Sequence, residues 1–188
     1  MGRPKQLLTH DGRTFLRRAA ETAVASGCQP IVVVLGADAD VLQRETSGLP
    51  VQRVVNGRWA DGLGSSIRAG LAALNNWDRE GAVEAVVLML CDQPFVAPAV
   101  INGLVVAYWA SGKGIIASEY GGTLGVPALF GRRYFAELAA LDGAEGAKRV
   151  IAAHTSEVGR MAFPQGASDI DTPEDYVQLQ RATPAQPS

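Results

Sequence analysis

The chain has 188 residues, of which 47% are hydrophobic and 19% charged, and its formal net charge is -2. This composition is typical of a folded globular protein and excludes the disordered class, and the longest apolar run is far too short to cross a bilayer. A nearly balanced charge without a lysine-rich block or interleaved aromatic residues excludes nucleic acid as an expected partner.

The length favours one domain, which we expect to cover residues 1–181, followed by a flexible tail at residues 182–188 that is rich in Pro, Gln and Ala. Cys28 and Cys91 lie far apart and fit no metal-binding spacing, so we interpret them as ordinary buried thiols. No secretory signal is recognisable, and a cytoplasmic location is therefore expected.

The predicted elements begin with a basic, loop-like segment at residues 2–8 that has no strand before it. Thr14 is a good N-cap for a first amphipathic helix, which ends before Gly27. The further elements, in chain order, are a strand at 31–35, a helix at 38–45, a strand at 51–55, a helix at 66–76, a strand at 86–90, a helix at 98–111, extended runs at 114–118 and 126–130, helices at 132–141 and 144–153, a strand at 158–163 and a last helix from Pro173.

Strands that alternate with helices predict a three-layer α/β/α, Rossmann-like domain with a mostly parallel sheet. The two extended runs near Gly121-Gly122 interrupt the alternation, and a simple hairpin turn is our leading interpretation there. The strand at 86–90 is apolar throughout, which is typical of a strand buried on both faces. It delivers Asp92 to the carboxyl edge of the sheet, where ligands bind in such folds. Asp92 could equally cap the following helix.

Polar residues at element ends could support phosphate chemistry. Two carboxylates from separate strand ends, Asp92 and one of Asp169 or Asp171, could hold one Mg²⁺ beside a phosphate. Arg3 and Lys5 could neutralise a departing polyphosphate, although a solvated terminus explains them as well. Asp169 and Asp171 compete with ordinary helix-start chemistry, which accounts for residues 172–175 but not for Asp169.

A glycine- and serine-rich loop at residues 56–66 leads into a helix and offers backbone N–H groups and hydroxyls for a nucleotide. It matches neither the phosphate loop nor the dinucleotide fingerprint, so a capped helix with a flexible entry is an equal alternative. No Ser/His/Asp or Cys/His pattern supports a covalent hydrolase.

Five motifs, taken together and in this order, resemble the molybdenum cofactor cytidylyltransferase-like nucleotidyltransferases over nearly the whole chain. They are GRPKQLL at residues 2–8, NGRWADG at 56–62 with SSIRAGL at 65–71, LCDQPF at 90–95, GVPALF at 125–130 and DIDTPEDY at 169–176. The resemblance implies a nucleotide-diphospho-sugar-transferase-type fold. It also implies transfer of CMP from CTP to a phosphorylated molybdopterin-type acceptor, with release of pyrophosphate.

The resemblance also implies roles for single residues. Lys5 and Asp92 would be catalytic; the nucleotide would lie against Arg3, Lys5, Gly64, Ser65 and Ser66; Mg²⁺ would lie on Asp92, Asp171 and Asp169; and the acceptor would lie against Gln93, Gly125 and Pro127.

One departure from the family is the absence of its first strand and Leu-Ala-Ala-Gly-x-Ser-x-Arg-Met-type glycine loop before the Lys5 segment. We expect that Met1 corresponds to the methionine of that motif, and that neighbouring strands have unpaired backbone groups. Two alternatives stay open: nucleotidyl transfer to another phosphorylated small molecule, and a non-catalytic module that delivers the cofactor to a molybdoenzyme.

Overall fold

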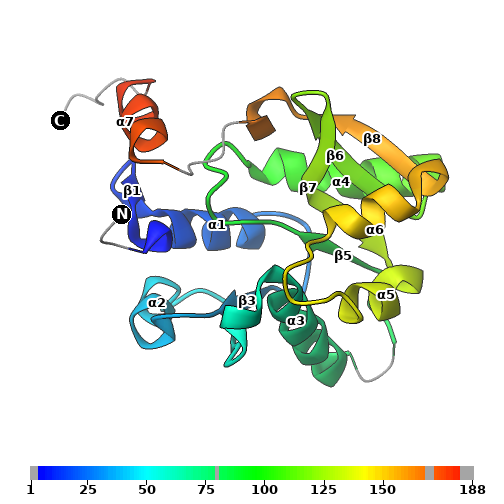
Figure 1. Ribbon diagram of the computed structural model, residues 1–188, viewed down its shortest axis with the longest axis horizontal. Coiled ribbons are helices and arrows are strands. Elements are labelled where there is room, and N and C mark those ends of the chain that lie inside the picture. Colours follow the sequence, from blue (N-terminus) through cyan, green and yellow to red (C-terminus); the bar gives the residue numbers. More distant parts are fainter. Residues whose placement is uncertain (1–3, 79–80, 168–171, 183–188) are drawn as a thin grey trace.

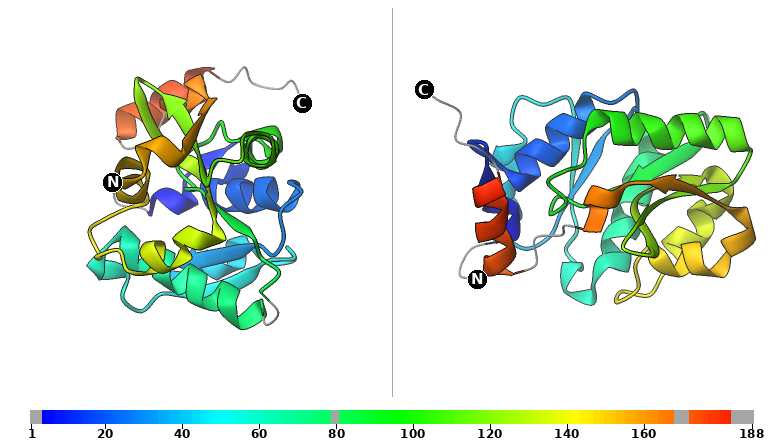
Figure 2. Two further views of the ribbon diagram at one scale, coloured as in Figure 1. Left: turned by 90° about the vertical axis from the view of Figure 1, so that its right-hand side faces the viewer. Right: turned by 90° about the horizontal axis from the view of Figure 1, so that it is seen from above.

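Two of the three separate sheets lie between layers of helices in the computed structural model, which describes residues 4–78, 81–167 and 172–182 (Figures 1 and 2). The described elements share the alternating order that the sequence predicts. They are η1 (Lys5–Leu7), β1 (Thr9–His10), β2 (Arg13–Thr14), α1 (Phe15–Val24), β3 (Val32–Leu35), α2 (Ala39–Glu45), β4 (Gln52–Val55), η2 (Trp59–Asp61), α3 (Leu63–Trp77), β5 (Ala85–Leu88), α4 (Pro98–Ser111), β6 (Ile115–Tyr120), β7 (Thr123–Gly131), η3 (Arg132–Tyr134), α5 (Phe135–Ala139), α6 (Lys148–Ala153), η4 (Thr155–Glu157), β8 (Val158–Ala162), η5 (Pro164–Ala167) and α7 (Pro173–Ala182).

The larger sheet has the strand order β5-β7-β6-β8, and the second sheet is the parallel pair β3-β4. Within the larger sheet, β7 runs against both β5 and β6, whereas β8 is parallel to β6. Strands β5, β6 and β8 therefore share one direction and β7 alone opposes them. The expected mostly parallel α/β/α architecture is confirmed.

Helices cover both faces of the larger sheet. On one face, α3, α5 and α6 pack against alternate residues of β5, β6 and β7, with Phe130 and Val150 completely buried. On the other face, Leu104 of α4 packs against Ile116 and Leu129. Because successive residues of a strand point to opposite faces, a largely apolar strand serves both helix layers.

Local signals predict several elements closely. Helix α1 begins after Thr14, whose hydroxyl accepts a hydrogen bond from the Arg17 N–H at 3.2 Å. Helix α7 follows Thr172, whose hydroxyl accepts from the Asp175 N–H at 3.1 Å. The predicted turn between β6 and β7 is confirmed, since Gly121 and Gly122 both have positive φ, the requirement of a tight two-residue hairpin turn.

Other elements differ from the prediction. A short hairpin, β1–β2, turns at Asp11-Gly12, where the sequence analysis expects no strands. The expected helices at 132–141 and 144–153 are shorter, because only Phe135–Ala139 and Lys148–Ala153 are α-helical.

The strand β5 is half-buried along its whole length, which corrects the prediction of a strand buried on both faces. Strand β3 is likewise half-buried at its first three residues. The cause is a cavity between the two strands, described below.

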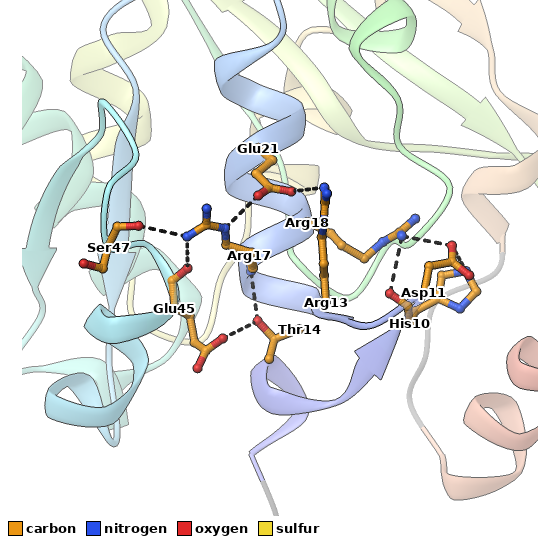
Figure 3. A network of polar contacts seen from close by, with 9 residues as sticks. All are labelled: His10, Asp11, Arg13, Thr14, Arg17, Arg18, Glu21, Glu45 and Ser47. Atoms are coloured by element: carbon orange, nitrogen blue, oxygen red, sulfur yellow. Dashed lines mark hydrogen bonds and ion pairs between the residues drawn. The ribbon is translucent and has the colours of Figure 1, made fainter. Parts of the chain in front are cut away.

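A polar network ties α1 to the elements on either side of it (Figure 3). The guanidinium of Arg17 donates to Glu21 at 2.7 Å and to the carbonyl of Ser47, beyond α2, at 2.9 Å. The hydroxyl of Thr14 donates to Glu45 at the end of α2 at 2.8 Å. The hairpin turn joins the same helix, since Arg18 donates to Asp11 at 3.1 Å. These contacts fix the β1–β2 hairpin and the end of α2 relative to α1.

A partly buried ion pair anchors the start of β5. The carboxylate of Asp78, only 2% exposed, accepts from Arg132 at 2.7 Å and from the Ala82 N–H at 2.6 Å. The hydrogen bond from Arg132 is the main cause that holds the pKa of Asp78 below its ordinary value of 3.8. Its stabilising contribution is therefore present above that pH and is lost as the pH falls through the lowered folded pKa.

We expect Asp78→Asn to destabilise the protein at neutral pH, because Arg132 loses its charged partner. The difference in unfolding free energy from the unsubstituted protein should narrow as the pH falls below 3.8. Urea unfolding at a series of pH values measures this difference. The loss of unfolding free energy caused by Arg132→Gln should decrease over the same pH range. A difference that stays constant with pH would contradict the assignment.

Candidate functional site

The segment after β5 and the segment η1 meet at one edge of the fold. Burial raises the pKa of the Cys91 thiol to about 12, the negative charge of Asp92 adds to that rise, and the positive charge of Lys5 opposes it. Both charges must lie close to Cys91 to act on it, since charge interactions fall off with distance. The structure thus places Lys5 near the Cys91-Asp92 segment, although Lys5 and Asp92 lie 87 positions apart in the sequence. It also keeps the thiol of Cys91 protonated at neutral pH.

Gln93 joins this edge to β7. Its side chain is 6% exposed and its amide donates to the carbonyl of Val126 at 3.1 Å. The hydroxyl of Tyr120 donates to the same carbonyl at 3.0 Å, and the peptide bond before Pro127 is cis. The ring of Pro127 is completely buried. Gln93 and Pro127 therefore shape the Gly125 segment, and Gly125 is itself buried in β7 opposite Ser118 of β6, so all three predicted acceptor residues are buried.

Gly125 has two close neighbours that a side chain would displace. A Cβ at this position would lie 2.3 Å from the hydroxyl of Tyr120 and 3.1 Å from Cε of Lys148. Lys148 is exposed at the first position of α6, and no described carboxylate forms an ion pair with it. Lys148 is not recognisable as a site residue from the sequence, because it belongs to no motif and only the folded chain places it beside Gly125.

The glycine- and serine-rich loop packs tightly against residues 142–145. The N–H of Gly64 donates to the carbonyl of Gly143 at 2.9 Å. A Cβ on Gly64 would lie 2.2 Å from the carbonyl oxygen of Asp142, and one on Gly62 would lie 2.2 Å from that of Gly143. The glycines thus allow close backbone contact, and the N–H of Gly64 already has a partner other than a phosphate.

The two serines of this loop have different roles. The hydroxyl of Ser65 is buried, accepts from Asn56 at 2.8 Å and lies within hydrogen-bond distance of the carbonyls of Arg58 and Gly62. Ser66 accepts from Asn56 at 3.1 Å and lines the cavity, so its hydroxyl proton can be donated to a ligand. We therefore retain Ser66 as a nucleotide-binding candidate and assign Gly64 and Ser65 to the structure of the loop.

A cavity of about 1140 Å³ is lined by Ser66, Cys91 and Lys148, among other residues. At the carboxyl ends of the strands it is lined by Gln6, Ser66, Cys91 and Lys148, and along the strands by the side chains of β3 and β5. Its polar end therefore lies where α/β proteins bind ligands.

Three predicted site residues, Arg3, Asp169 and Asp171, lie outside the described residues. Within the ranges that are described, no three metal-binding side chains cluster. The helix that follows Asp171 packs against the segment that follows Lys5: Tyr176 and Gln180 donate to the carbonyl of Thr9 at 2.7 and 2.6 Å. Figure 1 shows α7 beside β1.

No described helix could span a membrane.

Comparison with solved structures gives a close match in fold. The structure of Rv0371c from Mycobacterium tuberculosis H37Rv in complex with manganese has a TM-score of 0.79 and 28% sequence identity, and the match covers 96% of this chain and 92% of that one.

Two curated proteins are similar in sequence. Nicotine blue oxidoreductase from Paenarthrobacter nicotinovorans is 36% identical over 105 residues, which are 56% of this chain and 48% of that protein. The chain thus matches about half of that relative's length. The purine catabolism protein PucB from Bacillus subtilis is 26% identical, and the match covers 97% of this chain and 90% of that protein.

Residues 1–158 match the family described as the MobA-like NTP transferase domain. The match spans most of the chain, including Lys5, the glycine- and serine-rich loop, Asp92, Gly125 and Lys148. By this match and by its fold, the chain belongs to the MobA-like NTP transferase family of nucleotidyltransferases.

Proposed function

We propose that the chain transfers CMP from CTP to a phosphorylated molybdopterin-type cofactor and releases pyrophosphate. The observation that carries the proposal is the meeting of Lys5 and Asp92 around Cys91, at the end of the cavity where Ser66 and Lys148 also lie. Opposite charges beside a hydroxyl and a second cation suit a nucleotide, a metal ion and an acceptor phosphate. The pterin acceptor rests on the ordered set of five motifs.

The reaction needs no covalent intermediate with the protein. An oxygen of the acceptor phosphate forms a bond to the α-phosphorus of CTP, and the bond from that phosphorus to the bridging oxygen breaks as pyrophosphate leaves. Lys5 would neutralise the charge that develops on the pyrophosphate. Ser66 would donate to the nucleotide, and the exposed Lys148 beside Gly125 would bind the acceptor phosphate.

A divalent cation such as Mg²⁺ fits the described residues. Magnesium commonly uses one or two protein carboxylates and takes its other ligands from water and phosphate, and Asp92 would supply such a carboxylate next to Cys91, which lines the cavity. Asp171 and Asp169 are proposed as further ligands. When bound, the ion would neutralise phosphate charge and favour attack on the α-phosphorus.

The test is a panel of nucleoside triphosphates and acceptors with Mg²⁺ or Mn²⁺, read by pyrophosphate release. We expect CTP with the molybdopterin cofactor to react fastest and chelation with EDTA to stop the reaction. A preference for a sugar phosphate would instead support transfer to another small molecule. Metal-dependent CTP binding by calorimetry without any pyrophosphate release would support the cofactor-delivery module.

A second candidate function comes from the similarity to nicotine blue oxidoreductase, which is 36% identical over 105 residues and whose name describes an oxidoreductase. A reduced nicotinamide dinucleotide carries a ribose and phosphates that the same cations and hydroxyl could bind. Adding it with a pterin or quinonoid dye and following its oxidation separates this function from nucleotidyl transfer. Oxidation of the dinucleotide without pyrophosphate release in the panel would overturn the first proposal.

A further inference from the structure

Helix α7 joins the β1–β2 hairpin through two hydrogen bonds to one carbonyl. The hydroxyl of Tyr176 donates to the carbonyl of Thr9 at 2.7 Å, and the side-chain amide of Gln180 donates to the same oxygen at 2.6 Å. Residues four apart on a helix lie on one face, and a carbonyl oxygen has two lone pairs. One face of α7 therefore saturates the acceptor that Thr9 presents.

An apolar contact lies beside these hydrogen bonds. Phe15, the first residue of α1, and Leu179 of α7 are both buried, and Leu8 and Tyr176 pack against them. The rings of Phe15 and Tyr176 meet edge to face, with their centroids 6.2 Å apart. Tyr176 thus contributes its ring to the packing and its hydroxyl to the hydrogen bond, and the two together define how α7 lies against the hairpin.

The backbone connects this docking from Thr9 to Lys5. The N–H of Leu8 donates to the carbonyl of Lys5 at 3.0 Å, and the carbonyl of Leu8 accepts from the N–H of Phe15 at 2.8 Å. No residue of η1 is fully buried. The position of Lys5 therefore depends more on the residues to which η1 is attached than on the packing of η1 itself.

The ion pair between α1 and the hairpin turn cannot replace the docking of α7. Arg18 of α1 donates to Asp11 at 3.1 Å (Figure 3), but the side chain of Asp11 is 48% exposed. Exposed ion pairs stabilise little, because water screens them and ordering the two side chains costs entropy. The hydrogen bonds from α7 lie beside a buried apolar contact instead, and they are made at Thr9, four residues from Lys5.

We propose that α7 is a clamp that positions Lys5, with Tyr176 and Gln180 as the positioning residues. The clamp holds Thr9, and through η1 it keeps the amine of Lys5 near the Cys91-Asp92 segment. A lysine side chain has much rotamer freedom, so a fixed backbone lowers the entropy cost of placing its charge on a phosphate. The gain in nucleotide affinity rests on the proposed function, whereas the position of Lys5 does not.

The experiment compares variants of the full chain. Tyr176→Phe removes one hydroxyl and keeps the ring that contacts Phe15. Gln180→Ala removes the second donor to Thr9. The matched control is Gln178→Ala, at an exposed position of the same helix whose side chain makes no hydrogen bond to the described residues.

The first readout uses no nucleotide. NMR relaxation gives the order parameter of the Lys5 backbone N–H, and urea unfolding gives the global stability. With both donors removed, we expect the Lys5 order parameter to fall from about 0.85, usual for rigid backbone, to below about 0.6, while that of Val33 in β3 stays unchanged. A residue that only stabilises the fold would lower the unfolding free energy without loosening Lys5 in the folded state.

The second readout is CTP binding with Mg²⁺, measured by calorimetry in proteins that carry Lys5 or Lys5→Gln. Tyr176→Phe and Gln180→Ala should each weaken CTP binding by about fivefold when Lys5 is present, the usual equilibrium effect of one hydrogen bond. Neither should weaken it in the Lys5→Gln protein, because two changes that act through one residue are not additive. Gln178→Ala should leave both readouts unchanged.

Two outcomes would overturn the proposal. A rigid Lys5 in the protein that lacks both donors would mean that α7 only stabilises the fold. An equal loss of CTP affinity with and without Lys5 would mean that α7 acts on the nucleotide by another route. If Lys5 loosens but no protein binds CTP, the clamp is supported and the proposed function fails, so the two failures are distinguishable.

Discussion

Replacing Asp92 by asparagine is expected to lower the rate of nucleotidyl transfer by about 10²–10³-fold, a loss usual for one group that stabilises transition-state charge. Asparagine preserves the shape of the side chain but removes the negative charge that would hold a divalent cation beside the phosphates. The measurement is pyrophosphate release from CTP at saturating acceptor.

A second readout tests whether the carboxylate of Asp92 lies beside Cys91, as the structure places it. Because Asp92 contributes to the raised pKa of Cys91, Asp92→Asn should lower the pKa of that thiol, measured as the pH dependence of its alkylation. The matched control is Asp40→Asn at an exposed position of α2, which should change neither quantity. A shifted thiol pKa with an unchanged rate would remove Asp92 from the mechanism but leave its position intact.

The elements that the sequence predicts well are those with local signals. Helices α1, α4 and α7 begin at Thr14, Pro98 and Thr172-Pro173, where capping and fixed φ act within a few residues. The β1–β2 hairpin was also recognisable from its Asp11-Gly12 dipeptide, a strong turn signal that the sequence analysis did not use.

The features that the sequence does not reveal depend on contacts between residues that lie far apart in the chain. Lys148 enters the site because α6 packs near β7, and no local pattern indicates this. The hydroxyl of Ser65 is occupied by Asn56, nine positions away, so composition alone cannot separate it from Ser66. Asp92 is the opposite case, because it follows an apolar strand. That local pattern indicates both its place at the edge of the sheet and its possible role as a carboxylate ligand.

The half-exposure of β5 explains why an apolar run and a buried strand are not equivalent. The run Val86-Val87-Leu88 matches a strand covered on every side, and the helices of both layers do cover its two faces. Its open edge and the adjoining cavity leave the same side chains half-exposed. An apolar pattern therefore predicts that a strand is suited to a buried position. How far its side chains are buried depends on what lies along its edges.

Gly64→Ala is expected to destabilise the fold by about 1–3 kcal/mol, the usual cost of overfilling a packed site. The new Cβ would lie 2.2 Å from the carbonyl oxygen of Asp142 and 2.9 Å from that of Glu145, so backbone must move. Alanine also favours a helix over glycine by about 1 kcal/mol, which partly offsets the clash. A net loss of stability would therefore show that the contact between the loop and residues 142–145 is tight in solution.

The measurement is urea unfolding with and without CTP, and Gly57→Ala is the matched control. Gly57 lies in the same loop, where a Cβ would meet nothing within 4 Å, so its substitution should change stability by less than about 0.5 kcal/mol. The N–H of Gly64 donates to the carbonyl of Gly143 and is therefore not needed by the nucleotide. The folded Gly64→Ala protein should lose CTP affinity only if the movement of the loop displaces Ser66. If Gly64→Ala abolished CTP binding while leaving stability unchanged, the glycine would instead lie against the nucleotide, and the assignment of Gly64 to the structure of the loop would be wrong.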